Sequence, residues 1–116
     1  LSALCGILIA GTGAASAITY LMGGTYDNMV NTIKTMCSNL TGMMCDGAKQ
    51  GCALKVYSGV SAAVQAALLS MRGIKTNNDG IMEEGMERTI RNVGLIGTKG
   101  MEETDKTILN IMCNKK

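Results

Sequence analysis

Apolar residues recur at helical spacing early in the chain. Between Asp27 and Leu40 they fall on one side of a helix, in the order Met29, Ile33, Met36, Cys37 and Leu40. Thr25 or Asp27 can cap the start of this helix, and Gly42 follows its end. The pattern predicts a helix over Asp27–Leu40. Cys37 is expected in the core, because free cysteine usually packs as a small apolar residue.

A second apolar segment covers Cys52–Met71 and is rich in alanine. Before Arg72 its only long polar side chains are those of Lys55 and Gln65, and Gly73 supplies a stop signal. A helix with so little polar surface is expected to be buried almost all round. We therefore predict that Cys52–Met71 is the central helix of the fold.

The remaining helices are predicted in the more polar second half. The turn sequence 77–80 precedes Glu83 and Glu84, which we expect in the first turn of a helix with one apolar stripe: Met82, Met86, Ile90 and Val93. Its polar side would carry the pairs Glu84–Arg88 and Glu87–Arg91. A break bracketed by Gly97 and Gly100 comes before a last helix over Met101–Cys113. That helix would direct Met101, Ile108 and Met112 inward and pair Glu102 with Lys106 on its outer side.

The segment Leu1–Met22 is uncharged, but glycine, serine and threonine interrupt its apolar residues and no basic residue flanks it. These features favour a buried glycine-rich helix or a broken helix pair over a membrane span. No strand pattern emerges, so the sequence predicts one all-α domain over 1–116. Its architecture would be a compact bundle of about five helices around a buried central helix, with no membrane partner.

Composition narrows the chemistry available. The 116 residues include no His, which excludes Ser-His-Asp or Cys-His catalysis and His-ligated zinc within this chain. The five Cys form no Cys-x-x-Cys pair, which excludes a thioredoxin-type motif and a zinc ribbon. The net charge of +2 and the presence of only three aromatic residues, all Tyr, argue against a nucleic-acid partner.

The charged residues are unevenly distributed along the chain. Positions 1–58 hold only five of them: Asp27, Lys34, Asp46, Lys49 and Lys55. The other charges lie in 59–116, which reads as an ordinary solvated surface. We expect the first half of the chain to be buried against another surface.

Two glycine-rich stretches lie outside the regular helical pattern. The first, Cys5–Ser16, contains Gly11-Thr12-Gly13, but it lacks the features of a phosphate loop, and its glycines would allow close backbone approach. The second, Gly42–Lys55, gathers two Cys, one Asp and two Lys in a glycine-punctuated stretch that leads into the apolar helix. A helix N-terminus favours anions, so a thiolate or a substrate carboxylate suits this loop. A capped loop with Asp46 as N-cap and exposed lysines explains the same residues equally well.

Several motifs resemble the C-terminal part of the L-cysteine desulfidase and iron–sulfur L-serine dehydratase alpha-chain family. They are Cys-Gly-x3-Ala-Gly-x-Gly over Cys5–Gly13, Met-Cys-Asp-Gly-Ala-Lys-x-Gly-Cys-Ala-Leu-Lys over Met44–Lys55, Asn-Asp-Gly-Ile over Asn78–Ile81, Thr-Ile-Arg-Asn over Thr89–Asn92, and the segment Met101–Leu109. Full-length members carry a larger N-terminal portion with its own cysteine, and we expect that portion to be a separate part of the enzyme or a partner subunit.

The resemblance implies a 4Fe-4S cluster held by three cysteines. Two of these fall on Cys5 and Cys45, and the third would come from outside this chain. Three thiolates leave one iron open as a Lewis acid that polarises the leaving group of the substrate. The implied activity is β-elimination on a small amino acid, converting L-cysteine to pyruvate, ammonia and sulfide, or L-serine to pyruvate and ammonia. Such an enzyme would be cytoplasmic, and a homo-oligomer is compatible with the sequence.

The same motifs supply candidate site residues. The candidate bases are Lys49, Lys55, Asp46 and Asp79, although a lysine serves as a base only if its surroundings lower its pKa. For Lys49 we favour binding of the substrate carboxylate. Asp46 and Asn78 could bind the substrate ammonium, and the remaining substrate-binding candidates are Gly11, Thr12, Gly13, Gly47 and Asp79. Cys52 belongs to the motif but is not expected to be a ligand, and Cys113 is expected in the core or on the surface.

A second function from another class remains open at this point. The chain could be a non-catalytic helical module that docks onto a partner, because an uncharged face of this extent usually meets protein rather than water.

Overall fold

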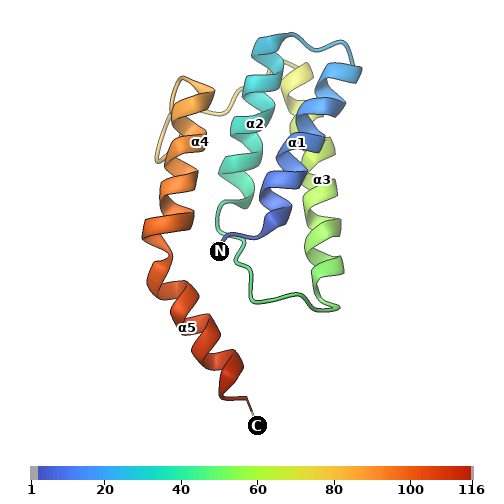
Figure 1. Ribbon diagram of the computed structural model, residues 1–116. Coiled ribbons are helices and arrows are strands. Elements are labelled where there is room, and N and C mark those ends of the chain that lie inside the picture. Colours follow the sequence, from blue (N-terminus) through green and yellow to red (C-terminus); the bar gives the residue numbers. More distant parts are fainter. Residues whose placement is uncertain (1–2, 116) are drawn as a thin grey trace.

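The computed structural model describes residues 3–115 and is all-α, as predicted. Its helices are α1 (Gly6–Leu21), α2 (Tyr26–Leu40), α3 (Cys52–Met71), α4 (Met86–Leu95) and α5 (Glu102–Cys113), and a π-helical turn, η1 (Ile96–Gly100), joins α4 to α5 (Figure 1). The predicted boundaries of α2 and α3 are confirmed to within one residue. Over residues 3–115, strand-like pairing is limited to one antiparallel bridge between Leu4 and Met44.

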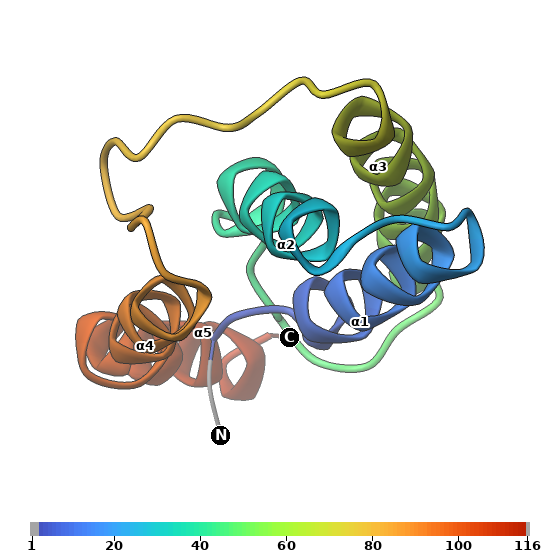
Figure 2. The same cartoon turned by 90° about the horizontal axis from the view of Figure 1, so that it is seen from above.

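Helices α1, α2 and α3 pack against one another, and α4 packs against α2 (Figure 2). The core between them is built from one side of each helix, with Leu8 and Ala15 from α1, Met36 and Cys37 from α2, and Ala63 from α3. Cys37 is only 4% exposed, so its predicted place in the core is confirmed.

Glycine allows α1 and α3 to approach closely. A Cβ atom added at Gly11 would lie 3.1 Å from Met36 Cε and 3.5 Å from the Gly59 carbonyl oxygen. A Cβ atom added at Gly59 would overlap Ile7 Cγ2. The expectation that glycines in the first stretch permit close backbone approach is therefore confirmed at Gly11.

Polar side chains also fix the three-helix packing. The hydroxyls of Thr19 and Thr32, both fully buried, hydrogen-bond across the α1–α2 interface at 2.8 Å. At the start of α2, Asn28 Nδ2 donates to the Ser70 carbonyl oxygen at 3.0 Å, and Ser70 Oγ donates to the Asn28 carbonyl oxygen at 2.7 Å. Thr25 caps α2 in a capping box with Asn28, which confirms one of the two predicted caps.

The central helix is α2, not α3. Helix α2 contacts α1, α3 and α4, whereas α3 contacts α1 and α2 only. The buried residues of α3 are all small and lie on one side, while its outer side exposes large apolar residues such as Leu54 and Tyr57, which are 72% and 73% exposed. The prediction that Cys52–Met71 is buried almost all round was wrong, because within residues 3–115 only the side of α3 that carries its small residues is covered.

The first segment forms one continuous helix rather than a broken pair. Gly11, Thr12 and Gly13 lie inside α1, so the first glycine-rich stretch is not a loop beyond its opening residue Cys5. At 16 residues, α1 is short for a membrane span. Among the described residues, α3 alone is long and apolar enough to cross a membrane by length and composition.

The second half departs from its prediction in two places. Helix α4 begins at Met86, so Glu83 and Glu84 precede it instead of forming its first turn. The predicted pairs Glu84–Arg88 and Glu87–Arg91 are not among the ion pairs formed within residues 3–115, whereas Lys106 Nζ lies 3.1 Å from Glu102 Oε1, as predicted. The predicted break at Gly97 and Gly100 is confirmed as η1.

Helix α5 extends away from the other helices (Figure 1). It contains no buried residue, and its helix-level contacts are with η1. Ile108 is only partly buried, and Ile111 and Met112 are exposed. The prediction of a buried inner stripe on this helix was therefore wrong. Helix α5 extends away from α1, α2 and α3, so these helices do not cover its apolar residues.

Candidate functional site

The two candidate ligand cysteines lie on backbone segments that pair with each other. The Cys5 amide donates to the Met43 carbonyl oxygen at 2.9 Å, and the Cys45 amide donates to the Ala3 carbonyl oxygen at 2.6 Å, on either side of the Leu4–Met44 bridge. In this register Cys5 stands opposite Met43 and Cys45 opposite Ala3. Because side chains alternate between faces, Cys5 and Cys45 lie on the same face as diagonal neighbours, a relation in which Cα atoms are about 7–8 Å apart.

The five cysteines occupy different environments. Cys5 is buried, Cys45 and Cys52 are partly exposed, and Cys113 is exposed, all as free thiols. Cys37 sits in the core, where burial raises the pKa of its thiol. Cys52 Sγ lies 3.7 Å from the Gly47 carbonyl oxygen, to which it donates, and so closes the loop between them. The sulfur available at the paired segments is thus that of Cys5 and Cys45.

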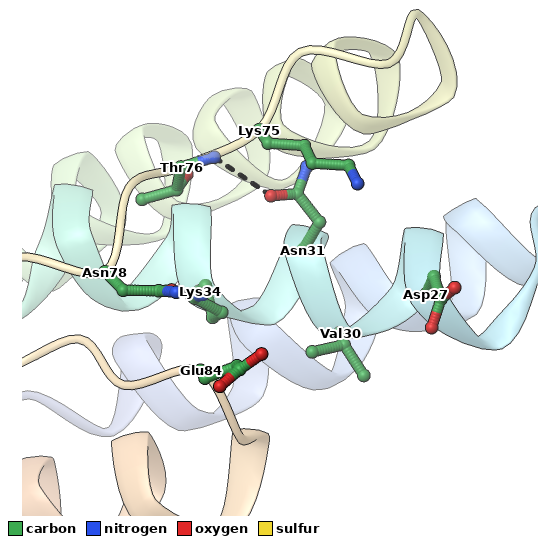
Figure 3. Close-up of a pocket in the computed structure, with 8 residues that line it drawn as sticks. All are labelled: Asp27, Val30, Asn31, Lys34, Lys75, Thr76, Asn78 and Glu84. Carbon is green, nitrogen blue, oxygen red and sulfur yellow. Dashed lines mark hydrogen bonds between the residues drawn. The ribbon is translucent and has the colours of Figure 1, made fainter.

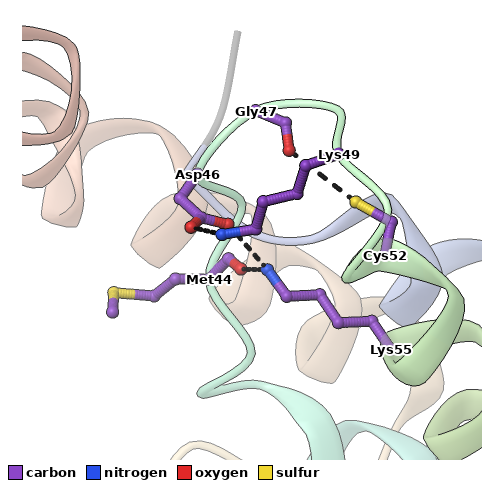
Figure 4. Close-up of polar contacts among 6 residues, drawn as sticks. All are labelled: Met44, Asp46, Gly47, Lys49, Cys52 and Lys55. Atoms are coloured by element: carbon purple, nitrogen blue, oxygen red, sulfur yellow. Dashed lines mark hydrogen bonds and ion pairs between the residues drawn. The ribbon is translucent and has the colours of Figure 1, made fainter. Parts of the chain in front are cut away.

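Asp46 follows Cys45 directly and forms ion pairs with both Lys49 and Lys55 (Figure 4). Its Oδ2 accepts from Lys49 Nζ, and its Oδ1 accepts from Lys55 Nζ at 3.0 Å. Lys55 Nζ also donates to the Met44 carbonyl oxygen at 2.6 Å, which ties the first turn of α3 to the paired segment. Asp46, Lys49 and Lys55 therefore form one cluster next to the two cysteines, and Asp46 binds the lysines instead of capping α3.

Hydrogen bonds to Asp46 favour the charged forms of Asp46 and Lys55. Hydrogen bonds from Lys49 and then Lys55 lower the pKa of Asp46 to about 2. The hydrogen bond to Asp46 raises the pKa of Lys55, with smaller electrostatic contributions from Asp46 itself and from Cys5 and Cys52. A carboxylate of such low pKa is a weak base, and a lysine of raised pKa stays protonated at neutral pH. In this conformation the pair suits binding of a charged group better than proton removal.

A cavity of about 410 Å³ opens beside Asp46 and Lys49 and is lined by two separate parts of the chain. The loop contributes Asp46, Gly47, Ala48 and Lys49, and the end of α5 contributes Ile108, Ile111, Met112 and Lys115. Gly47 has a φ of +92°, which favours glycine, and a Cβ atom added there would lie 2.9 Å from Met112 Cε, the movable end of an exposed side chain. The sequence did not predict that the end of α5 lines this cavity. The only signal was the place of Met112 in an apolar stripe, which indicates burial but not the partner.

The other candidate residues lie elsewhere. Gly11, Thr12 and Gly13 are on α1. Thr12 Oγ1 donates to the Leu8 carbonyl oxygen at 2.6 Å, and Thr12 and Cys37 both line an apolar cavity of about 380 Å³. The Asn78 side chain accepts a hydrogen bond from Lys34 of α2, and Asp79 is exposed in the same loop. None of these five residues lines the cavity beside Asp46.

The cysteines of this chain can supply part of the iron–sulfur cluster that the family resemblance implies. Within residues 3–115, no three Cys, Asp or Glu side chains gather closely enough to hold a metal ion. By the alternation of side chains along the paired segments, the Cys5 and Cys45 thiols fall on one face. They would be the two ligands from this chain, and a third would come from elsewhere. Thiolates are the ligands that iron–sulfur clusters use, so Cys5 and Cys45 fit two positions of such a group.

Relatives of this chain are longer proteins. It is 51% identical over 117 residues to a UPF0597 protein of Phocaeicola vulgatus, 52% identical over 116 residues to one of Parabacteroides distasonis, and 47% identical over 118 residues to one of Desulfatibacillum aliphaticivorans. These matches cover 99–100% of this chain and 27% of each relative, so the chain spans about a quarter of their length. No solved structure matches it significantly.

A sequence profile described as serine dehydratase alpha chain matches residues 1–110, which include Cys5, Cys45 and the group of Asp46, Lys49 and Lys55. The chain belongs to the serine dehydratase alpha chain family.

Proposed function

We propose that this chain is the cluster-bearing part of an iron–sulfur lyase that performs β-elimination on a small amino acid. The single observation that supports this most is the placement of Cys5 and Cys45 on one face of paired segments, next to Asp46 and its two lysines. Family membership supports a dehydratase-related lyase in general, and the cluster and the substrate are the finer parts of the proposal.

In this proposal Cys5 and Cys45 would hold a 4Fe-4S cluster together with a third cysteine from outside this chain. When bound, the cluster supplies an open iron that acts as a Lewis acid on the leaving group. Lys49 and Lys55 bind the substrate carboxylate as fixed positive charges, because Asp46 holds both ammonium groups together. Of the two lysines, Lys49 lines the cavity. Asp46 acts as the positioning residue, since a carboxylate with a pKa of about 2 is poorly suited to taking the α-proton.

The substrate is a small amino acid, with L-cysteine placed ahead of L-serine. The loop motif over Met44–Lys55 resembles desulfidase members more than strict serine dehydratases. Overall, L-cysteine and water would give pyruvate, ammonia and sulfide. Pyruvate and sulfide released from L-cysteine, compared with pyruvate released from L-serine, measure this preference directly. The free thiols of this chain agree with a cytoplasmic enzyme, since the cytosol keeps thiols reduced.

The ligand assignment is tested by anaerobic reconstitution with iron and sulfide. The chain is produced together with the portion of its full-length relatives that it does not cover, and the visible thiolate-to-iron absorbance is recorded. Cys5→Ser and Cys45→Ser should each lose most of this absorbance. Cys113→Ser is the matched control, because Cys113 is exposed on α5 and should leave it unchanged. Full retention of the cluster in both Cys5→Ser and Cys45→Ser would refute the assignment.

A second candidate function, docking onto a partner, is favoured by the exposed apolar side of α1 and α3. The large exposed residues there include Ile9, Tyr20, Leu21, Leu54, Tyr57 and Val60, and the outer side of α1 carries no charge. An apolar surface of this kind commonly meets another protein surface. We propose that it meets the remaining portion of the same enzyme, since the relatives are about four times as long as this chain.

Docking is tested by mixing this chain with the separately produced remaining portion of a relative. Tyr57→Asp and Val60→Asp should abolish co-elution, and Glu103→Gln on α5 is the surface control. Co-elution that is unchanged by both aspartate variants would refute this placement of the interface. Partition of the chain into vesicles without any co-elution would instead assign the surface to a membrane.

A further inference from the structure

A buried lysine lies at the side of α2, away from the cysteines. Lys34 is 7% exposed, and among residues 3–115 its only hydrogen-bond acceptor is Asn78 Oδ1. No carboxylate in that part of the chain lies within ion-pair distance of its ammonium group. A buried ammonium paired only with a neutral amide is unfavourable, because buried charges normally require an opposite charge.

The lysine lines a cavity of about 340 Å³ between α2 and the loop that leads to α4. One wall is held in place by Asn31, whose Nδ2 donates to the Ile74 carbonyl oxygen at 2.7 Å and whose Oδ1 accepts from the Thr76 amide at 2.9 Å (Figure 3). The hydroxyls of Thr35 and Thr76 are also hydrogen-bonded, at 2.6 Å. The loop is therefore fixed against α2 by side chains of α2 itself, and the cavity is already formed.

The cavity carries charges of both signs. Lys34 and Lys75 supply two cationic groups, and Asp27 and Glu84 supply two carboxylates. In Figure 3, Glu84 lies near the end of the cavity occupied by Lys34 and Asn78, and Asp27 lies toward the other end. The carboxylates are exposed residues that do not neutralise Lys34, so both signs of charge are available to a ligand.

We propose that this cavity binds a small α-amino acid as its zwitterion. The carboxylate would bind Lys34 Nζ, supplying the missing negative charge, and the ammonium group would bind Glu84, which lies at the same end of the cavity (Figure 3). A cavity of this size, without an aromatic side chain in its lining, suits a small polar molecule and not a nucleobase. The site is separate from the proposed lyase site, because its lining includes no cysteine and no residue of the loop 44–55.

The test measures binding by isothermal titration calorimetry on the 116-residue chain without iron, so that it does not depend on a cluster. The probes are L-serine, 3-hydroxypropanoate, which lacks the ammonium group, and ethanolamine, which lacks the carboxylate. L-Serine should bind with saturation, and each analogue should bind at least tenfold more weakly. No saturable binding of L-serine, or equal binding of either analogue, would overturn the proposal.

Variants assign the binding to this cavity. Lys34→Met keeps the length of the side chain and removes a buried charge, so the fold should be retained, as far-UV circular dichroism can verify. This variant should weaken L-serine binding at least tenfold, and Lys106→Met on α5 is the matched control. Glu84→Gln, an exposed position, should weaken L-serine and leave 3-hydroxypropanoate unaffected. Binding that survives Lys34→Met but is lost in Lys55→Met would place the ligand at the loop cluster and overturn the proposal.

Discussion

The close approach of α1 and α3 makes a quantitative prediction about two glycines. Gly59 lies in the middle of α3 and Gly13 in the middle of α1, so alanine improves helix propensity at both positions by about 1 kcal/mol. Their surroundings differ. A Cβ atom at Gly13 would have no neighbour within 4 Å, whereas at Gly59 it would overlap Ile7 Cγ2.

The magnitude follows from this difference. Ile7 Cγ2 belongs to a β-branched side chain with restricted χ1, so it cannot move aside freely. Overpacking of this kind costs about 1–3 kcal/mol. The propensity gain is common to both variants, so Gly13→Ala should be more stable than Gly59→Ala by about 1–3 kcal/mol. Gly13→Ala itself should exceed the unmodified chain by up to about 1 kcal/mol.

Urea unfolding followed by far-UV circular dichroism measures both free energies, provided that the m-value is unchanged. Ile7→Ala removes the overlapping methyl group. In a chain that carries Ile7→Ala, Gly59→Ala should therefore be less destabilising than it is in the unmodified chain. Equal stabilisation by Gly13→Ala and Gly59→Ala would refute the inferred contact between α1 and α3.

Three further predictions concern buried and charged groups. Thr19→Val leaves the buried Thr32 hydroxyl without its partner and should lower the free energy of unfolding by about 1–3 kcal/mol. The double variant Thr19→Val with Thr32→Val should recover part of this loss. Equal losses in the single and double variants would argue against the hydrogen bond. The pKa of Asp46 is held at about 2, so its ion pairs with Lys49 and Lys55 are fully present above the ordinary carboxyl pKa and are lost as the pH falls through about 2. In an NMR titration, Lys49→Met should raise the pKa of Asp46, while Lys106→Met should leave it unchanged. Burial raises the pKa of Cys37, so iodoacetamide should modify exposed Cys113 first and Cys37 last, as peptide mass spectrometry would report; early modification of Cys37 would contradict its place in the core.

The helices could be predicted wherever periodicity and caps agreed. The stripe from Met29 to Leu40 with Thr25 before it predicted α2, and the alanine-rich run before Gly73 predicted α3. The position of α3 in the bundle could not be predicted in the same way. An absence of charge indicates that a surface avoids water, but it does not say whether the covering surface belongs to the same chain.

The candidate site was predictable in its residues and less so in its arrangement. The spacing of Cys45, Asp46, Lys49 and Lys55 placed them in one loop, and the structure joins three of them by hydrogen bonds. The pairing of Cys5 with Met43 rests on main-chain atoms, which leave little trace in side-chain composition. The sequence does not mark Lys34, because a single lysine in an amphipathic helix usually faces solvent. Only the folded chain shows that the loop around Asn78 covers it.

The bridge between Leu4 and Met44 makes the spacing of the two thiols a property of the backbone. Its two hydrogen bonds use only amides and carbonyls, so substitutions at the flanking side chains leave the register available. The two segments are about forty positions apart in sequence and meet because α1 and α2 pack antiparallel. Separation of those helices would part the sulfurs even with every cysteine intact. The juxtaposition of Cys5 and Cys45 therefore reports on the tertiary integrity of the α1–α2 pair.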